Sequence, residues 1–404
     1  MKEKNNRVRS WIALSLCFLL LIGALYVALT ARSPSAQTHQ QTLTDVGFDT
    51  FVTFSQEGTQ EEFDENLAFI RERFLYYNQL FDRYQSDEGV NNLKTINDAA
   101  GDHAVVVDDA LIDCLLMART YTGYSPHFDA SQGTLLEVWH TYREEGISLN
   151  EAGEDGRLPE EAELQRAANA QSWDVVRIDE ESNEVMIIDP DVSLDLGGIA
   201  KGYAVEQVKR ELEEKGVDGA ILNAGGNVVT IGEKSDGSAW RVGVQMPSSL
   251  SDSTLAVLEL NGSHAIVTSG DYQRYYEVNG ERYAHIIDPL TLYPPRYFRA
   301  VTVVCDDSAA ADCISTTLFT LTYEEGLAYL STLEEQGILE TLRRVISRLN
   351  EIFRFAISEE LIEFNPADNL VARFKKPKKQ NMPALPPSEL GRLMLALQNA
   401  SIRK

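Results

Sequence analysis

The sequence predicts an α+β fold, with a single mixed domain of helices and strands over residues 45–330. Helix-like and strand-like blocks follow one another without regular βαβ alternation, and the sequence has no internal repeat of fixed period. The composition of 44% hydrophobic and 24% charged residues is ordinary for a globular protein with a large core, which excludes wholesale disorder. We expect an N-terminal signal or anchor helix before this domain and an appended all-α segment after it.

Residues 1–36 have the features of a signal peptide or a membrane anchor. The run Trp11–Thr30 contains no charged residue and follows four basic ones, Lys2, Lys4, Arg7 and Arg9. Its 20 residues are enough to span a bilayer of ~30 Å as a helix, so an uncleaved anchor and cleavage near Ala31 or Ala36 both remain open. Basic residues before the apolar run predict that the rest of the chain is exported and lies at the extracytoplasmic face of the cell membrane.

The first half of the predicted domain is mostly helical. A strand is expected at Phe48–Phe54, a long helix at Phe63–Phe81 and an extended segment at residues 104–107. Asp109 is expected to cap a helix through Leu111–Thr122, which places Cys114 on a buried helical face. Cys305 and Cys313 either pair outside the cell or remain as two buried thiols.

The second half is richer in strands. Asp195 begins a loop that leads into a helix ending near Leu212, and residues 310–317 have a helical pattern. The expected strands are Gly219–Asn223, Val228–Ile231, Trp240–Met246, Ala265–Thr268, Tyr275–Val278 and Val301–Cys305.

Two glycine-rich loops suggest anion binding. The first leads into an expected helix, and the second follows an expected strand. The segment Asp195–Ala204 combines small residues, a lysine and the start of a helix, where free amides attract phosphate. It matches neither the P-loop nor the dinucleotide fingerprint, and a tight packing turn is the alternative. The segment Asn223–Asn227 is a second such loop, with a hairpin turn as its alternative.

Three further segments add polar side chains of a kind that suits phosphate and metal chemistry. They are the loop Thr268–Tyr272, the segment Ala284–Pro289 with His285 on an expected strand, and the helical residues 310–317. Asp312 and Thr316 are four residues apart, so their oxygens share one helix face and can both reach a hard cation such as Mg²⁺. A solvated face or a local hydrogen bond is the alternative for this pair.

The five motifs together resemble, in order, those of the FAD:protein FMN transferases, also called ApbE-like flavin transferases. The resemblance runs from about Phe48 to Leu330. It implies that FAD is the substrate, that the threonine hydroxyl of an acceptor protein attacks the FMN-side phosphorus, and that AMP leaves in a reaction that needs Mg²⁺.

The same resemblance assigns roles to particular residues. Mg²⁺ would be held by Asp312, Thr316 and the carbonyl of Gly198, and Lys201 would face the pyrophosphate. His285 would deprotonate the acceptor threonine, although a satisfied core histidine is the alternative. Asp195 would bind the cofactor or orient its loop as a cap. The remaining expected contacts to the flavin nucleotide are Asn223, Gly225, Gly226, Ser269, Gly270, Asp271 and Tyr272.

The sequence departs from the family in a few places. Glu206 stands where an aspartate is usual, and Leu292 follows Thr291 where a glycine is usual. A member of the family would also continue past Leu330 with further strands, whereas here the chain changes character.

Residues 336–404 form a basic helical segment that resembles a fragment of a phage-type tyrosine integrase. The formal net charge of the whole chain is −26, yet residues 341–404 carry 12 basic and 6 acidic residues. The catalytic residues of an integrase would lie beyond this fragment, and an unrelated basic tail is the alternative. We expect a fusion with its join between about Leu330 and Gly337. We do not expect DNA as a partner, because the rest of the chain is strongly acidic. The alternative function is therefore an exported flavin-binding carrier, or an inactive truncated transferase fused to a DNA-binding-like fragment.

Overall fold

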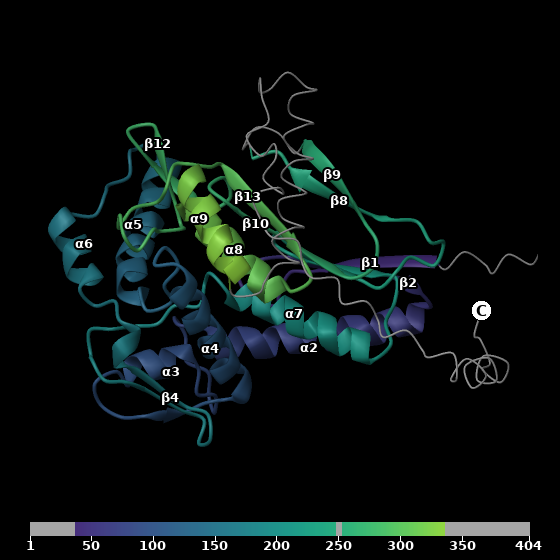
Figure 1. The fold of residues 1–404 in the computed structure, drawn as a ribbon, viewed down its shortest axis with the longest axis horizontal. Coiled ribbons are helices and arrows are strands. Elements are labelled where there is room, and N and C mark those ends of the chain that lie inside the picture. Colours follow the sequence, from purple (N-terminus) through teal and green to yellow (C-terminus); the bar gives the residue numbers. More distant parts are fainter. Residues whose placement is uncertain (1–36, 248–252, 336–404) are drawn as a thin grey trace, which may run out of the picture.

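The computed structural model describes residues 37–247 and 253–335 (Figure 1). The expected signal or anchor segment and the integrase-like segment lie outside these residues. Within the described part of the chain, no helix combines the length and the apolar character needed to cross a bilayer.

A six-stranded sheet forms the centre of the fold, and every neighbouring pair of strands in it is antiparallel. In spatial order the strands are β1 (Gln37–Leu43), β2 (Val52–Gly58), β6 (Ala220–Ala224), β7 (Asn227–Ile231), β10 (His264–Gly270) and β13 (Ala300–Cys305). Side chains alternate between the two faces of such strands, so β10 sends Ala265 and Val267 to one core and Ile266 to another.

Helices cover one face of the sheet, and a hairpin covers the other. The contacts of the first face are made by α2 (Gln60–Phe81), α7 (Ala200–Glu214) and α8 (Ser308–Thr320). Figure 1 shows α2 and α7 side by side, with α8 above them. On the second face, β8 (Trp240–Gln245) and β9 (Thr254–Leu260) pack Trp240 and Leu258 against Ile266.

The helices begin where the sequence supplies side-chain caps. Thr59 and Glu62 form a reciprocal capping box at the start of α2, which satisfies amides that would otherwise lack partners. Asp307 caps α8 by accepting from the amide of Ala310. Its partner helix α7 is tied to α8 by Glu206, whose carboxylate accepts from the amide of Ser308 at 2.8 Å.

Two smaller units lie beside the central layers. One contains α3 (Leu93–Asp98), α4 (Asp109–Tyr124) and a three-stranded sheet of β3 (Val105–Val106), β5 (Glu184–Ile187) and β4 (Val176–Asp179). The other packs α5 (Gly133–Glu151) and α6 (Glu161–Ala168) against the hairpin of β11 (Tyr275–Val278) and β12 (Glu281–Ala284) around Trp139. The last described helix is α9 (Tyr323–Glu335), and a short 3-10 turn spans Trp173–Val175.

The structure corrects three local predictions. The strand expected at Phe48–Phe54 begins only at Val52, because Phe48 and Asp49 have positive φ values of 56° and 47° and form a turn. The cap of α4 is Asp108 rather than Asp109. His285 does not lie on a strand but directly after β12, which ends at Ala284.

The structure also gives information on the cysteines and on the region around the expected domain end. Cys114, Cys305 and Cys313 are free and buried, which favours the buried-thiol alternative over a disulfide. The expected domain end at residue 330 falls inside α9, and Leu333, beyond that point, is 1% exposed within the main core.

Candidate active site

A pocket of about 620 Å³ lies where the glycine-rich loops, the end of β10 and the helices α7 and α8 meet. All but two of the predicted site residues line it: Asp195, Gly198, Lys201, Gly225, Gly226, Ser269, Gly270, Tyr272, His285, Asp312 and Thr316. Segments up to about 120 residues apart in sequence therefore converge in one cavity of a size typical of ligand sites.

Oxygen atoms that could ligate a metal ion lie on one wall of the pocket. Asp312 is buried on α8, and its Oδ2 accepts from the amide of Gly202 at 2.8 Å. Thr316 lies one turn later, and in the described residues its hydroxyl makes no hydrogen bond, whereas the hydroxyl of Thr317 donates to a helix carbonyl. Gly198 approaches this turn so closely that a Cβ there would lie 3.5 Å from Cγ2 of Thr316. The three predicted metal ligands thus lie together.

The chemistry of this wall suits a hard cation. Burial raises the pKa of the Asp312 carboxyl, while the Lys201 ammonium opposes that rise, so a bound cation would favour the charged form. The buried side-chain amide of Asn227 lies near Asp312 and also opposes the rise in the pKa of that carboxyl. Carboxylate, hydroxyl and carbonyl oxygens are the ligands that Mg²⁺ prefers. Among residues 37–247 and 253–335 there is no cluster of three or more His, Cys, Asp or Glu side chains placed to hold a metal.

The lysine of the first glycine-rich loop is fixed by the second. Nζ of Lys201 donates to the carbonyl oxygen of Gly225 at 3.0 Å, and burial lowers the pKa of this lysine. Gly225 has a φ of 55°, and a Cβ there would lie 1.9 Å from Oγ1 of Thr50. Glycine is required at this position by both the backbone conformation and the space, which explains why the loop carries small residues.

His285 presents one unprotonated nitrogen. Its backbone amide and its Nδ1 both lie near the carbonyl oxygen of Arg274, at 3.1 and 3.3 Å. A carbonyl can only accept, so the proton is on Nδ1 and Nε2 keeps its lone pair. Burial, together with the positive charges of Arg274, Arg143 and Lys201, lowers the pKa of His285 to about 3. The imidazole is therefore neutral at pH 7.

The loop after β10 is held by its own contacts. The hydroxyl groups of Ser269 and Ser315 are hydrogen-bonded at 2.8 Å, which ties the end of β10 to α8. The ring of Tyr272 lies over Gly270, where a Cβ would meet it at 2.6 Å. The ring therefore leaves no room for a larger side chain at residue 270, and only the backbone of Gly270 can contact a ligand.

Comparison with known proteins decides the family. The model of the ApbE family matches residues 36–339. The chain belongs to the ApbE family. A relative from Klebsiella pneumoniae named FAD:protein FMN transferase is 32% identical over 300 residues, covering 72% of this chain and 86% of its own. A protein of the same name from Haemophilus influenzae is 27% identical over 310 residues, covering 74% of this chain and 82% of its own.

Solved structures of the family share the fold. The ApbE protein of Thermotoga maritima superposes with a TM-score of 0.62 at 29% identity, covering 75% of this chain and 92% of its own. The flavin transferase ApbE from Vibrio cholerae gives a TM-score of 0.60 at 23% identity, covering 74% and 91%.

Two of the residues expected from the ApbE resemblance do not line the pocket. The side chain of Asn223 accepts from the amide of Gly226 at 3.3 Å and so shapes the turn. Asp271 forms an ion pair with Arg299 at 2.9 Å. Both side chains are engaged in holding loops, which motif matching cannot distinguish from binding.

The sequence analysis missed several residues of the pocket: Arg83, Tyr84, His127, Arg143 and Arg274. Arg274 lies two residues after Tyr272, so a basic residue beside that motif was a usable clue. His127 precedes Phe128 and pairs through Nδ1 with the buried Asp288 at 2.9 Å, a contact across 161 residues that no local pattern reveals.

Proposed function

We propose that this protein transfers the FMN moiety of FAD to a threonine hydroxyl of an acceptor protein and releases AMP, with Mg²⁺ bound. The observation that carries the proposal is the convergence in one pocket of a neutral histidine, a lysine and three oxygen donors. The names of the curated relatives support the same activity.

The residues divide the chemistry between them. A bond forms between the threonine oxygen and the FMN-side phosphorus, and the bond from that phosphorus to the bridging oxygen breaks, so AMP leaves with that oxygen. The hydroxyl proton passes to Nε2 of His285, the nitrogen that has no hydrogen on it. When bound at Asp312, Thr316 and the Gly198 carbonyl, Mg²⁺ supplies positive charge against the pyrophosphate oxygens. Lys201 adds a fixed positive charge on the same side.

The cationic side chains explain how an acidic protein attracts an anionic dinucleotide. The chain carries a formal net charge of −26, but Lys201, Arg143 and Arg274 line this pocket. They are also the charges that lower the pKa of His285. A bound pyrophosphate offsets them, which raises the pKa of the imidazole and makes it a better base only when the substrate is present.

We further propose that the reaction takes place at the extracytoplasmic face of the membrane. The support is the uncharged run Trp11–Thr30 with basic residues before it. These residues lie outside the described part of the chain, so the proposal rests on the sequence.

The test is to incubate the protein with FAD, Mg²⁺ and a threonine-bearing acceptor domain and to weigh the acceptor by mass spectrometry. We expect a gain equal to FMN less one water, and no gain when the acceptor threonine is replaced by valine. Binding of FAD without modification of the acceptor would instead support the carrier or inactive-transferase alternative.

A further inference from the structure

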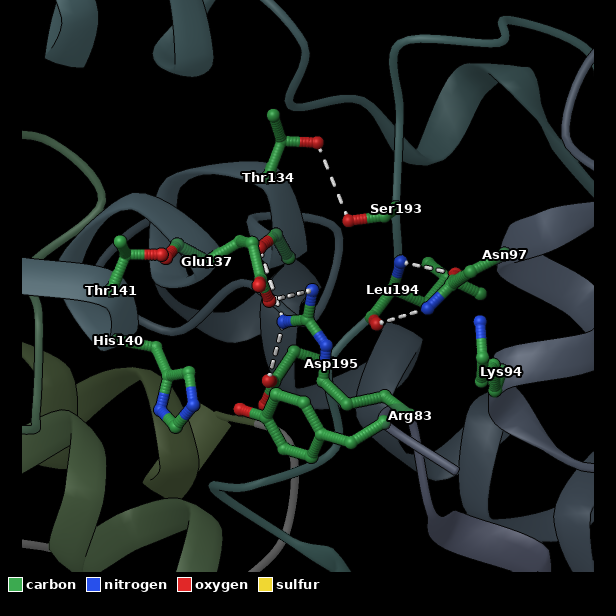
Figure 2. A network of polar contacts seen from close by, with 12 residues as sticks. Arg83, Lys94, Asn97, Thr134, Glu137, His140, Thr141, Ser193, Leu194 and Asp195 are labelled. Carbon is green, nitrogen blue, oxygen red and sulfur yellow. Dashed lines mark hydrogen bonds and ion pairs between the residues drawn. The ribbon is translucent and has the colours of Figure 1, made fainter. Parts of the chain in front are cut away.

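Arg83 lines the pocket and joins three parts of the chain. It follows α2, and its side chain is only 9% exposed. Nη1 donates to Oδ2 of Asp195 at 2.8 Å and to the carbonyl oxygen of Gly133 at 3.1 Å, and Nη2 donates to Glu137 at 3.3 Å. Figure 2 shows the guanidinium between the carboxylates of Asp195 and Glu137.

The other oxygen of Asp195 holds the glycine loop. Oδ1 accepts from the amide of Gly197 at 2.7 Å, immediately before Gly198. The chain that leads into this loop is fixed as well, because Asn97 makes two hydrogen bonds to the backbone of Leu194, at 2.8 and 2.9 Å (Figure 2). One carboxylate therefore connects the buried guanidinium to the loop whose carbonyl is the expected metal ligand.

The positive charge of Arg83 balances the negative charge of Asp195 in the wall of the pocket. The Asp195 side chain is 12% exposed and lines the pocket that an anionic dinucleotide would enter. Burial by itself would lower the pKa of Arg83, but Asp195, together with Tyr84 and Glu137, offsets it, so this pKa is raised and the guanidinium stays charged. Without that charge, Asp195 would place an uncompensated negative charge in the wall of an anion site.

We propose that Arg83 is a positioning residue for the substrate site: through Asp195 it sets the Gly197–Gly198 loop for metal and pyrophosphate binding, and it neutralises the carboxylate facing the substrate. This inference rests on the proposed function, since it concerns the same site. Residues that orient metal ligands through hydrogen bonds typically change metal affinity by about 10- to 100-fold when replaced.

The experiment compares Arg83→Gln, Arg83→Lys and the control Arg73→Gln in the full chain. Arg73 belongs to α2 and makes a two-bond ion pair with Glu211, at 2.7 and 2.8 Å, but neither residue lines the pocket. Binding of FAD is followed by flavin fluorescence during Mg²⁺ titration, so the readout does not depend on turnover. Melting temperatures are recorded for each variant, and binding is measured well below all of them.

We expect Arg83→Gln to raise the Mg²⁺ concentration for half-maximal FAD binding by about 10- to 100-fold. Arg83→Lys should give a smaller rise, because an ammonium keeps the charge but cannot reproduce the planar fork of hydrogen bonds. Arg73→Gln should lower the melting temperature without changing the Mg²⁺ requirement.

Either of two results would overturn the proposal. One is a wild-type Mg²⁺ requirement in Arg83→Gln, or in Arg83→Lys if the glutamine variant does not fold. The other is an equal shift in Arg73→Gln, which would show a general effect of lost stability. A wild-type protein that binds FAD in this assay but never modifies an acceptor would refute the proposed function alone.

Discussion

Replacing Gly202 by alanine tests whether the close crossing of α7 and α8 fixes the pocket wall that carries Asp312. A Cβ at residue 202 would lie 2.5 Å from the carbonyl oxygen of Ser308 and 2.5 Å from Cβ of Asp312. Ordinary contacts begin near 3.4 Å, so the two helices must separate by about 0.9 Å. The amide of Gly202 also donates to Asp312, so this movement displaces the buried carboxylate.

Two opposing effects determine how much the free energy of unfolding falls in Gly202→Ala. Overpacking of a tight interior costs about 1–3 kcal/mol, and the upper end applies here because backbone atoms are involved. Alanine recovers about 1 kcal/mol of helix propensity relative to glycine. We therefore expect the free energy of unfolding to fall by about 2 kcal/mol in Gly202→Ala, measured by urea denaturation. Mg²⁺-dependent FAD binding should weaken in the same variant.

A matched control is Gly326→Ala in α9. A Cβ at that position would lie 3.5 Å from Leu318, which is an ordinary contact, so this variant should be as stable as the wild type or up to about 1 kcal/mol more stable. If Gly202→Ala unfolds at the same urea concentration as the control and binds FAD normally, the helix crossing does not fix the site and the reasoning is refuted.

Four further predictions concern the proposed catalytic groups and the end of the domain. Asp312→Ala should abolish FMN transfer while leaving the fold nearly intact, and transfer by the wild type should stop in EDTA; activity that persists in both experiments would remove the metal assignment. His285→Ala should preserve FAD binding but slow acceptor modification by about 10² to 10⁴, and equal losses of binding and rate would favour a core histidine. Because the folded state lowers the pKa of His285 to about 3, protons bind the unfolded state first, so the stability advantage of the wild type over His285→Ala should shrink as the pH falls from 6.5 towards 3. Leu333→Ala should lower the free energy of unfolding by about 2–5 kcal/mol, and an unchanged denaturation midpoint would show that the domain does end near residue 330.

The elements that could be predicted from the sequence are those with a strong apolar pattern. The long helix α2 and the strands β6, β7 and β10 lie close to their expected positions because they bury regular sets of side chains. Strand β1 has the sequence QTHQQTL and only one buried residue, so no hydrophobic alternation marks it. It forms by pairing with β2 along the edge of the sheet, which is a property of the tertiary structure.

The site could be predicted where glycine or a motif was required, and not where distant charges meet. Gly225 is required by a positive φ and by Thr50, so its loop stands out in the sequence. The ion pair between Arg83 and Asp195 spans 112 residues, and the local sequence around either residue does not indicate its partner. Asp271 shows the converse, since its motif is present in the sequence but its carboxylate forms an ion pair with Arg299 and does not line the pocket.

The connection between β2 and β6 has a consequence for how this protein reaches its working form. These strands are neighbours in the sheet, yet about 160 residues, including α2 to α7, lie between them along the chain. Closing so long a loop has an entropic cost that must be met before the pairing contributes, and folds dominated by such distant pairs form slowly. Formation of the pocket also depends on contacts between distant residues, because its supporting hydrogen bonds join residues 110 to 161 positions apart. The pocket therefore forms only in the complete fold. A chain that has formed its helices but has not paired β2 with β6 lacks the nucleotide site.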